Sequence, residues 1–133
     1  MLTFKSLTNI KIEIIVEGLL ASFADYFVQM PQSVNFWKNH WQRNRVRYDL
    51  SFGVFDGENL VGFMVNGVDF RDGKLMAFNA GTGVIPSHQG QKIVKQLYNF
   101  ALPIFKNNGI ENFALEVIAQ NNKSHKSVSI RWV

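Results

Sequence analysis

The sequence contains no cysteine in its 133 residues. This absence excludes disulfide bonds, thiolate nucleophiles and cysteine-based metal sites. The sequence also lacks an apolar run of about eighteen residues and a signal-peptide pattern, so we expect a soluble cytoplasmic protein without membrane contact. Histidines are few, and the spacing of His40, His88 and His125 is not that of metal ligands. We therefore assign no metal.

The excess of positive over negative charge is also small. The chain has 14 lysines and arginines against 10 aspartates and glutamates, which gives a net charge of +4. This balance is compatible with an anionic ligand but does not by itself indicate nucleic-acid binding. Because 47% of the residues are hydrophobic, there is enough apolar material for one core, and we interpret residues 1–133 as a single domain.

A group of basic residues lies beside two tryptophans, a pattern that occurs in proteins binding single-stranded nucleic acid. The group comprises Lys38, His40, Arg43, Arg45 and Arg47, with Trp37 and Trp41. Arg45 and Arg47 alternate with apolar residues, as solvent-facing residues of a strand do. We favour the solvated strand face, and nucleic-acid binding stays the weaker alternative.

Hydrophobic periodicity predicts an α/β fold, with a mixed central sheet flanked by helices in the order β-α-α-β-β-β-α-β-α. The expected elements are a strand at 2–4, a helix capped by Thr8 or Asn9 and reaching Phe27, a helix at 33–42, strands at 46–54, 60–68 and 75–85, a helix from 87 to the Asn107-Asn108-Gly109 stop, a strand at 113–118, and a last helix capped by Asn121 or Asn122. The aromatic segment 23–27 either borders an acceptor pocket, with Asp25 attracting an ammonium group, or is the packed end of a helix.

The stretch 81–94 organises the chain. It reads as the end of a strand, a short turn and the first turn of a long amphipathic helix. The opening turn, 87–91, is polar and nearly free of bulky side chains. A helix start has unpaired backbone N–H groups and a partial positive charge, so this turn predicts a pyrophosphate site. An ordinary strand-to-helix junction is the alternative.

The motifs of this stretch resemble those of the GNAT superfamily of acyl-CoA-dependent N-acyltransferases. In that family, a strand ending in a Val-x-Pro-like turn meets the pattern Gln/Arg-x-x-Gly-x-Gly/Ala. Here Val84-Ile85-Pro86 and the segment from Gln89 to Val94 match that pattern, and Leu115-Glu116-Val117-Ile118 with Asn121 and Asn122 match the start of a second motif. The resemblance covers nearly the whole chain. Lys92 and Val94 depart from it, because the family has small residues there.

The resemblance implies an enzyme that transfers an acetyl group from acetyl-CoA to a primary amine of a small molecule or a protein. The implied coenzyme-binding residues are Val84, Ile85, Gln89, Gly90, Gln91, Lys92, Ile93, Val94, Asn121 and Asn122. Backbone near Val84 and Ile85 would pair with the pantetheine arm, and Glu116 is the candidate general base, with an exposed strand carboxylate as its alternative. In the family, a tyrosine of the last helix donates the proton to the leaving thiolate. The alternative function is an acyl-CoA-binding domain without turnover.

Members of the family continue past the last motif helix into two further strands. We therefore expect a C-terminally incomplete domain, an open strand edge near 113–118, and a homodimer formed through that edge. One hypothesis for the ending is a single-base deletion. Trp is encoded by TGG alone, and every Val codon begins with GT. When the codons of the last three residues are read in a frame shifted by one base, they therefore give a codon ending in TG, which encodes Leu, Met or Val, followed by GGT, which encodes Gly. A natural divergent terminus is the alternative.

Overall fold

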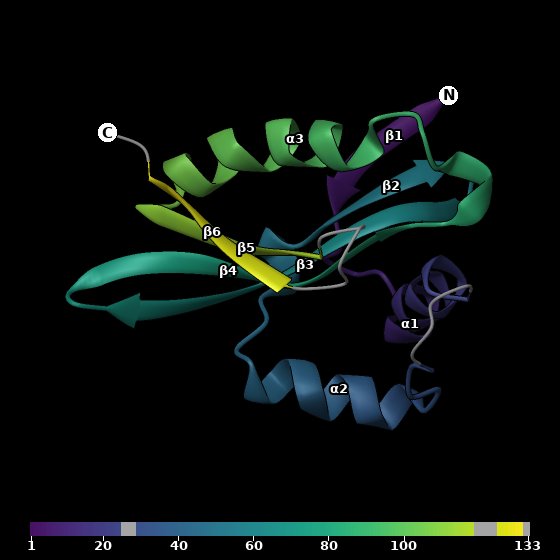
Figure 1. Ribbon diagram of the computed structural model, residues 1–133, viewed down its shortest axis with the longest axis horizontal. Helices are drawn as coiled ribbons and strands as arrows, with labels where there is room; N and C mark the ends of the chain where they lie inside the picture. Colours follow the sequence, from purple (N-terminus) through teal and green to yellow (C-terminus); the bar gives the residue numbers. More distant parts are fainter. Residues whose placement is uncertain (25–28, 119–124, 132–133) are drawn as a thin grey trace.

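The computed structural model describes residues 1–24, 29–118 and 125–131, and for 115–118 and 125–131 it describes the backbone alone. Strands form the centre of the molecule and helices lie outside them (Figure 1). The elements are β1 (Leu2–Ser6), α1 (Ile12–Ser22), α2 (Val34–Arg43), the 3-10 turn η1 (Tyr48–Leu50), β2 (Phe52–Asp56), β3 (Asn59–Arg71), β4 (Lys74–Val84), the 3-10 turn η2 (Pro86–His88), α3 (Ile93–Asn107), β5 (Asn112–Ile118) and β6 (His125–Arg131).

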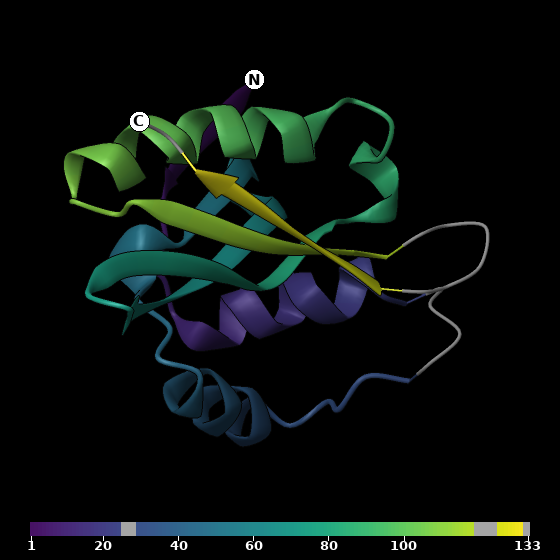
Figure 2. The same ribbon diagram turned by 60° about the vertical axis from the view of Figure 1, so that its left-hand side comes forward.

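The strands form one mixed sheet in the order β1-β2-β3-β4-β5-β6. All neighbouring pairs are antiparallel except β4 and β5, which are parallel. A parallel pair needs a crossover connection, and α3 supplies it. Figure 2 shows α3 on one face of the sheet and α1 and α2 on the other. The expected mixed sheet with flanking helices is confirmed.

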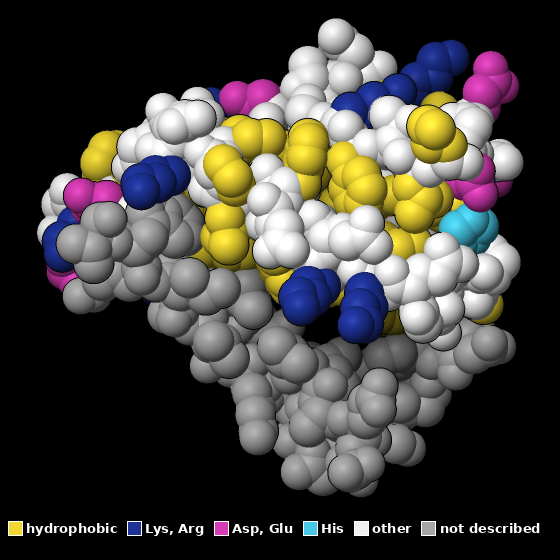
Figure 3. Space-filling view, turned by 90° about the horizontal axis from the view of Figure 1, so that it is seen from above, with side chains coloured by type: hydrophobic (Ala, Val, Ile, Leu, Met, Phe, Trp, Pro, Cys, Tyr) yellow, Lys and Arg dark blue, Asp and Glu magenta, His cyan; other side chains and the backbone are white. Residues whose placement is uncertain are grey.

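Two hydrophobic clusters hold the helices to the sheet, and β3 contributes to both because its side chains alternate between the faces. Met64 lies in the cluster beneath α3, whereas Phe63 and Val65 lie in the cluster beneath α1 and α2. Figure 3 shows a band of hydrophobic side chains on the α3 side of the molecule. Phe4 of β1 and Phe100 of α3, with ring centroids 5.9 Å apart, join these two elements there.

β4 and β5 separate early, and this separation shapes the rest of the sheet. They pair only from Met76↔Asn112 to Phe78↔Ala114, although both strands continue beyond these residues. The β3–β4 register steps from Val65↔Gly81 to Asn66↔Asn79, so Ala80 is an extra residue on β4. Such a β-bulge bends its strand. Beyond Phe78, the edge of β4 that faces β5 is therefore not paired with β5.

The last element differs from the expectation. A helix was predicted to begin at Asn121 or Asn122, which lie outside the described residues, but 125–131 form the strand β6. β6 pairs with β5 along its whole length, from Asn112↔Arg131 to Ile118↔His125. The edge near 113–118 that we expected to be open is therefore covered. The physical reason is that the unpaired backbone of β5 offers a complete ladder, and the run Ser-Val-Ser-Ile from 127 to 130 has the alternation of a strand.

Two glycines of the sheet give a stability test. A Cβ at Gly67 would overlap the backbone oxygen of Asn44 and the ring of Phe78, whereas a Cβ at Gly81 would meet only Phe63, at 3.9 Å. We expect Gly67→Ala to lower the free energy of unfolding by about 1–3 kcal/mol, because α2 must shift away from the sheet. Gly81→Ala should change it by less than about 0.5 kcal/mol. Urea denaturation measures both, and equal effects would contradict the packing of α2 on β3.

Candidate active site

A pocket of about 470 Å³ lies where α1 ends, β4 ends and the loop to α3 begins. It is lined by Ser22, Phe23, Gly83, Val84, His88, Gln89, Gly90, Lys92, Ile93 and Val94. Six of the residues predicted to bind the coenzyme lie together in this lining: Val84, Gln89, Gly90, Lys92, Ile93 and Val94. Ile85 and Gln91 do not line it.

The helix of this motif begins later than the sequence predicts. Residues 86–88 form the 3-10 turn η2, and α3 starts only at Ile93. Pro86 favours a turn, and Gly90 and Lys92 have positive φ values of 84° and 59°, which an α-helix does not accommodate. The N-cap Lys92 makes no side-chain cap, and the first N–H that bonds back to it comes from Gln96, at 3.0 Å. The first-turn N–H groups of α3 therefore have no intrahelical acceptor.

The end of β4 presents Val84, and not Ile85, to the side where β5 has moved away. The Ile85 N–H donates to the carbonyl oxygen of Val61 on β3, at 2.9 Å. Since successive residues of a strand direct their backbone groups to opposite edges, those of Val84 face away from β3. The amide of Gln89 donates to the Val84 carbonyl oxygen, at 3.1 Å. Of the two residues expected to pair with pantetheine, only Val84 directs its backbone groups away from β3, toward the side that β5 leaves open.

The end of α1 forms the opposite wall of the pocket. A Cβ at Gly83 would lie 2.9 Å from the Cβ of Ser22, so glycine is needed for this close approach. Phe23 lines this pocket. The expectation that the aromatic segment borders an acceptor pocket stays a prediction, and Asp25 lies outside the described residues. The sequence contained no signal for Ser22, because its contact depends on how α1 packs on the sheet.

His88 connects the pocket loop to the β2–β3 turn. Its Nε2 lies 2.9 Å from Oδ2 of Asp56, and its Nδ1 lies 2.7 Å from the Ser87 hydroxyl. The hydrogen bond with His88, and then the positive charge of the Met1 amino group, lower the pKa of Asp56. From the sequence, His88 was expected only as a member of the polar turn 87–91 and not as a metal ligand. Its true partner is distant in the sequence, so no local pattern indicated it.

A chain of polar side chains crosses the sheet where β4 and β5 separate. Asn66 is fully buried, and its amide donates to the Leu50 carbonyl oxygen at 2.8 Å. Asn79 Nδ2 donates to Oγ1 of Thr82 at 2.6 Å and to Oδ1 of Asn66 at 3.4 Å. Buried amides are costly unless hydrogen-bonded, so this chain fixes the orientation of Asn79.

The other residues predicted from the sequence lie apart from the pocket or are not described. Glu116 belongs to β5, opposite Ser127 on β6, and its side chain is outside the description. Asn121 and Asn122 also lie outside the described residues. Within the described parts of the chain, there is no group of three or more His, Cys, Asp or Glu residues arranged to hold a metal ion. No described helix is long and apolar enough to cross a membrane.

The basic and aromatic side chains of 37–47 do not form one exposed surface. Trp37 and Trp41 are buried in the cluster beneath α1 and α2. Arg45 forms an ion pair with Asp69, and Arg47 with Asp49. Single-stranded nucleic acid stacks on exposed aromatic rings, and these two rings are buried, so the described geometry does not favour nucleic-acid binding. The expected strand face is wrong as well, because Arg45 and Arg47 precede the 3-10 turn η1 and the strand β2 begins only at Phe52.

Comparison with known proteins identifies the family. The profile of the acetyltransferase (GNAT) family matches residues 16–127, most of the chain. The chain belongs to the GNAT acetyltransferase family. No curated protein sequence matches it. The family assignment therefore rests on the profile, and the arrangement of the site rests on this structure.

Solved GNAT structures share the fold. The ribosomal-protein-S18-alanine N-acetyltransferase of Escherichia coli aligns with a TM-score of 0.69 and 20% identity, over 92% of this chain and 70% of that one. A GNAT acetyltransferase from Brucella melitensis, solved with acetyl-CoA, aligns with a TM-score of 0.74 and 12% identity, over 96% and 87%. The PaiA N-acetyltransferase of Thermoplasma acidophilum, solved with coenzyme A, aligns with a TM-score of 0.63 and 18% identity, over 99% of each chain.

The conformation of Lys92 gives one prediction. Its φ of 59° is the left-handed conformation that glycine adopts without strain, and Lys92 stands where the GNAT pattern has a small residue. We expect Lys92→Gly to raise the free energy of unfolding by about 0.5–1 kcal/mol, because it removes this strain. Lys95→Gly, within α3, should lower it by about 1 kcal/mol. Thermal and urea unfolding measure both, and a loss of stability in Lys92→Gly would refute the left-handed N-cap.

The Asp56–His88 pair gives a second prediction, which concerns the pH dependence of stability. A carboxyl group whose pKa is lowered by folding stabilises the folded state above its unfolded pKa, about 3.9, and loses that contribution as the pH falls through its folded pKa. The stability advantage of the wild type over Asp56→Asn should therefore be present at about pH 6 and decline below about pH 4. Glu58→Gln, in the adjacent turn, is the control. An advantage that does not change with pH would contradict the pairing.

Proposed function

We propose that this protein transfers an acetyl group from acetyl-CoA to a primary amine of a small molecule or protein. The observation that carries the proposal is that one pocket joins the uncapped start of α3 to the unpaired edge of β4. A pyrophosphate needs N–H donors and positive charge, and an extended pantetheine needs the edge of a strand. The presence of acetyl-CoA or coenzyme A in structures of the same fold supports this assignment.

The first-turn N–H groups of α3 would hold the pyrophosphate, and Lys92, on the pocket wall, would add a charge-assisted contact. The backbone of Val84 would pair with an amide of pantetheine. The side-chain amide of Gln89 donates to the Val84 carbonyl oxygen in this structure. A pantetheine amide that pairs with Val84 would take the place of this hydrogen bond or share the carbonyl oxygen with Gln89. Asn121 and Asn122 are proposed as further coenzyme contacts, on the resemblance alone.

The acetyl transfer needs a neutral amine, because an ammonium group has no lone pair with which to attack the thioester. We assign the removal of its proton to Glu116, whose backbone lies on β5, directly or through water. A backbone N–H near Val84 would polarise the thioester carbonyl, as an oxyanion donor does. The oxygen that gains negative charge would then be stabilised without a metal.

A thermal-shift measurement with acetyl-CoA, followed by a thiol-release assay across a panel of amines, tests the proposal. An increase in the melting temperature with thiol release that depends on an amine is the expected result. An increase without thiol release from any amine would favour the alternative, an acyl-CoA-binding domain. Absence of any shift would remove both.

Substitution of Gly90 tests the pyrophosphate site. Gly90 has a φ of 84°, and a Cβ built on it meets no atom within 4 Å, so any side chain there is strained but finds space in the loop. Gly90→Glu and Gly90→Gln have the same shape and the same backbone strain. We expect Gly90→Glu to bind coenzyme A about tenfold more weakly than Gly90→Gln, because only the carboxylate repels the pyrophosphate. Calorimetry measures both, and equal affinities would place the pyrophosphate elsewhere.

A further inference from the structure

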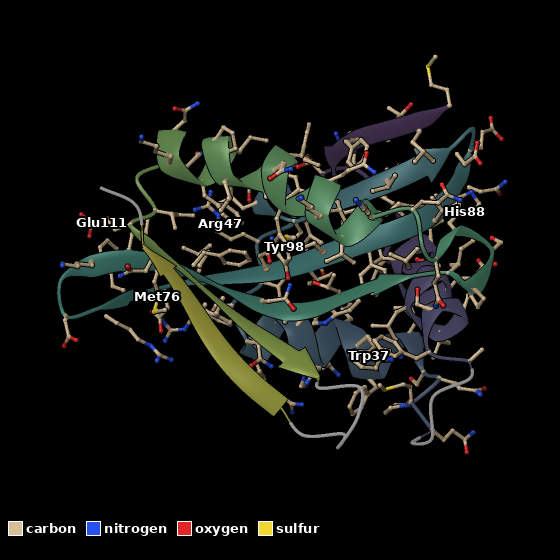
Figure 4. All side chains as sticks on the ribbon, turned by 45° about the horizontal axis from the view of Figure 1, so that its top comes forward. Trp37, Arg47, Met76, His88, Tyr98 and Glu111 are labelled. Carbon is tan, nitrogen blue, oxygen red and sulfur yellow. The ribbon has the colours of Figure 1, made fainter. Side chains whose placement is uncertain are left out.

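A second pocket, of about 400 Å³ and hereafter the α2 pocket, lies at the start of α1, between the β1–α1 loop, the C-terminal half of α2 and the segment that leads to η1. It is on the face of the sheet that carries Trp37, whereas Tyr98 lies with α3 on the other face (Figure 4). Its apolar lining consists of the buried Leu7 and the half-buried Ile10, Ile12 and Val46. Half-buried apolar side chains that gather around one hollow are typical of a site for a ligand with an apolar body.

Backbone hydrogen bonds fix the walls of the α2 pocket. The Leu7 N–H donates to the Ser51 carbonyl oxygen at 2.8 Å, which attaches the β1–α1 loop to the end of η1. The Val46 N–H donates to the Trp41 carbonyl oxygen at 3.0 Å, which attaches the segment before η1 to α2. Because both walls are held in this way, a ligand would enter a pocket that is already formed and would not have to order it.

Lys38 gives the α2 pocket a positive charge. It is an exposed residue of α2 that lines the pocket, and it has no ion-pair partner among the residues that the structure describes. By contrast, the nearby Arg45 and Arg47 are paired with Asp69 and Asp49. The described lining of the pocket contains no acidic residue. The charge on this apolar hollow therefore matches a ligand with one negative charge.

Tyr48 adds a neutral hydrogen-bond donor to the same lining. It is half-buried, and its hydroxyl has no hydrogen-bond partner among the described groups, although such a tyrosine usually finds one. Burial raises the pKa of Tyr48, so the phenol keeps its proton at neutral pH. Gln42, one turn after Lys38 on α2, and Asn9, on the facing loop, contribute exposed amide groups. The polar groups of the pocket are thus an ammonium, a phenol and two amides beside an apolar floor.

We propose that the α2 pocket binds a small carboxylate with an apolar body, such as an aryl-substituted or medium-chain acid. The carboxylate would accept hydrogen bonds from the Lys38 ammonium group and the Tyr48 hydroxyl, and the hydrocarbon part would cover Ile10, Ile12 and Val46. A phosphate dianion fits less well. Such a group is held by several cations or by a row of backbone N–H groups, and the described lining offers one cation.

This site is separate from the candidate active site. The helix α1 has 11 residues and is therefore about 16 Å long. Its first residue, Ile12, lines the α2 pocket, and its last, Ser22, lines the coenzyme pocket. The two described linings share no residue. The carboxylate is therefore neither reactant of the proposed acetyl transfer, and the inference does not depend on that function.

NMR titration of the ¹⁵N-labelled protein tests the site with three probes: 3-phenylpropionate, octanoate and the uncharged 3-phenylpropionamide. We expect at least one acid to shift the amide signals of 9–12 and 38–48 saturably, with a Kd between about 0.1 and 1 mM. The amide, which has nearly the shape of 3-phenylpropionate without its charge, should bind about tenfold more weakly than that acid. Absence of saturable shifts at these residues with both acids would overturn the proposal, and so would equal affinities for 3-phenylpropionate and its amide.

Four variants assign the recognition to named groups. Lys38→Met keeps most of the side-chain length and removes the charge, so it should weaken binding of the acid about tenfold and leave binding of the amide unchanged. Tyr48→Phe should weaken binding of the acid about fivefold. Lys95→Met and Tyr98→Phe change an exposed lysine and a half-buried tyrosine of α3 and should have no effect. Undiminished affinity in both Lys38→Met and Tyr48→Phe would overturn the proposal. If these variants do not fold, the comparison of acid and amide on the wild type still decides it.

Discussion

The separation of β4 from β5 is the constraint on which the rest of this structure depends. A parallel pair that is buried on both faces normally continues its ladder, because unpaired N–H and C=O groups are costly. Here the ladder stops at Phe78↔Ala114, and the bulge at Ala80 turns β4 away. The open edge is compensated in part by Gln89, which donates to Val84. The unpaired backbone groups of this strand edge can hydrogen-bond an extended ligand, and the N–H groups at the adjacent helix start can hydrogen-bond an anion.

The surroundings of this edge keep its shape. Asn66, fully buried, anchors Asn79 from the β3 side, and His88 ties the pocket loop to Asp56 at the end of the β2–β3 turn. Each of these contacts joins residues that are far apart in sequence, so the geometry of the site is a property of the packed sheet. The GNAT fold is shared with structures that are less than 25% identical, which is consistent with a geometry set by backbone pairing.

Local sequence patterns predicted the helices and turns that depend on residues close together in the sequence. Ser33 was expected to start α2, and its hydroxyl accepts from the Phe36 N–H as an N-cap does. Separate strands were expected to end at 54 and begin at 60, and a tight turn between Asp56 and Asn59 does connect β2 to β3. Alternation from Val46 also predicted a strand there. Instead Ser51 bonds back to the Arg47 carbonyl oxygen, and regular pairing begins only at Phe52. The late start of α3, the strand β6 and the Asp56–His88 pair depend on backbone conformation or distant partners, which periodicity does not reveal.

The proposed function requires that the edge of β4 at Val84 bind the coenzyme. Amide hydrogen exchange, followed by NMR with and without coenzyme A, tests it most directly. The N–H of Val84 and those of the first turn of α3 should become protected, whereas that of Ile85, already bonded to Val61, should change little. Protection confined to other parts of the sheet, with Val84 and the start of α3 unchanged, would contradict the account.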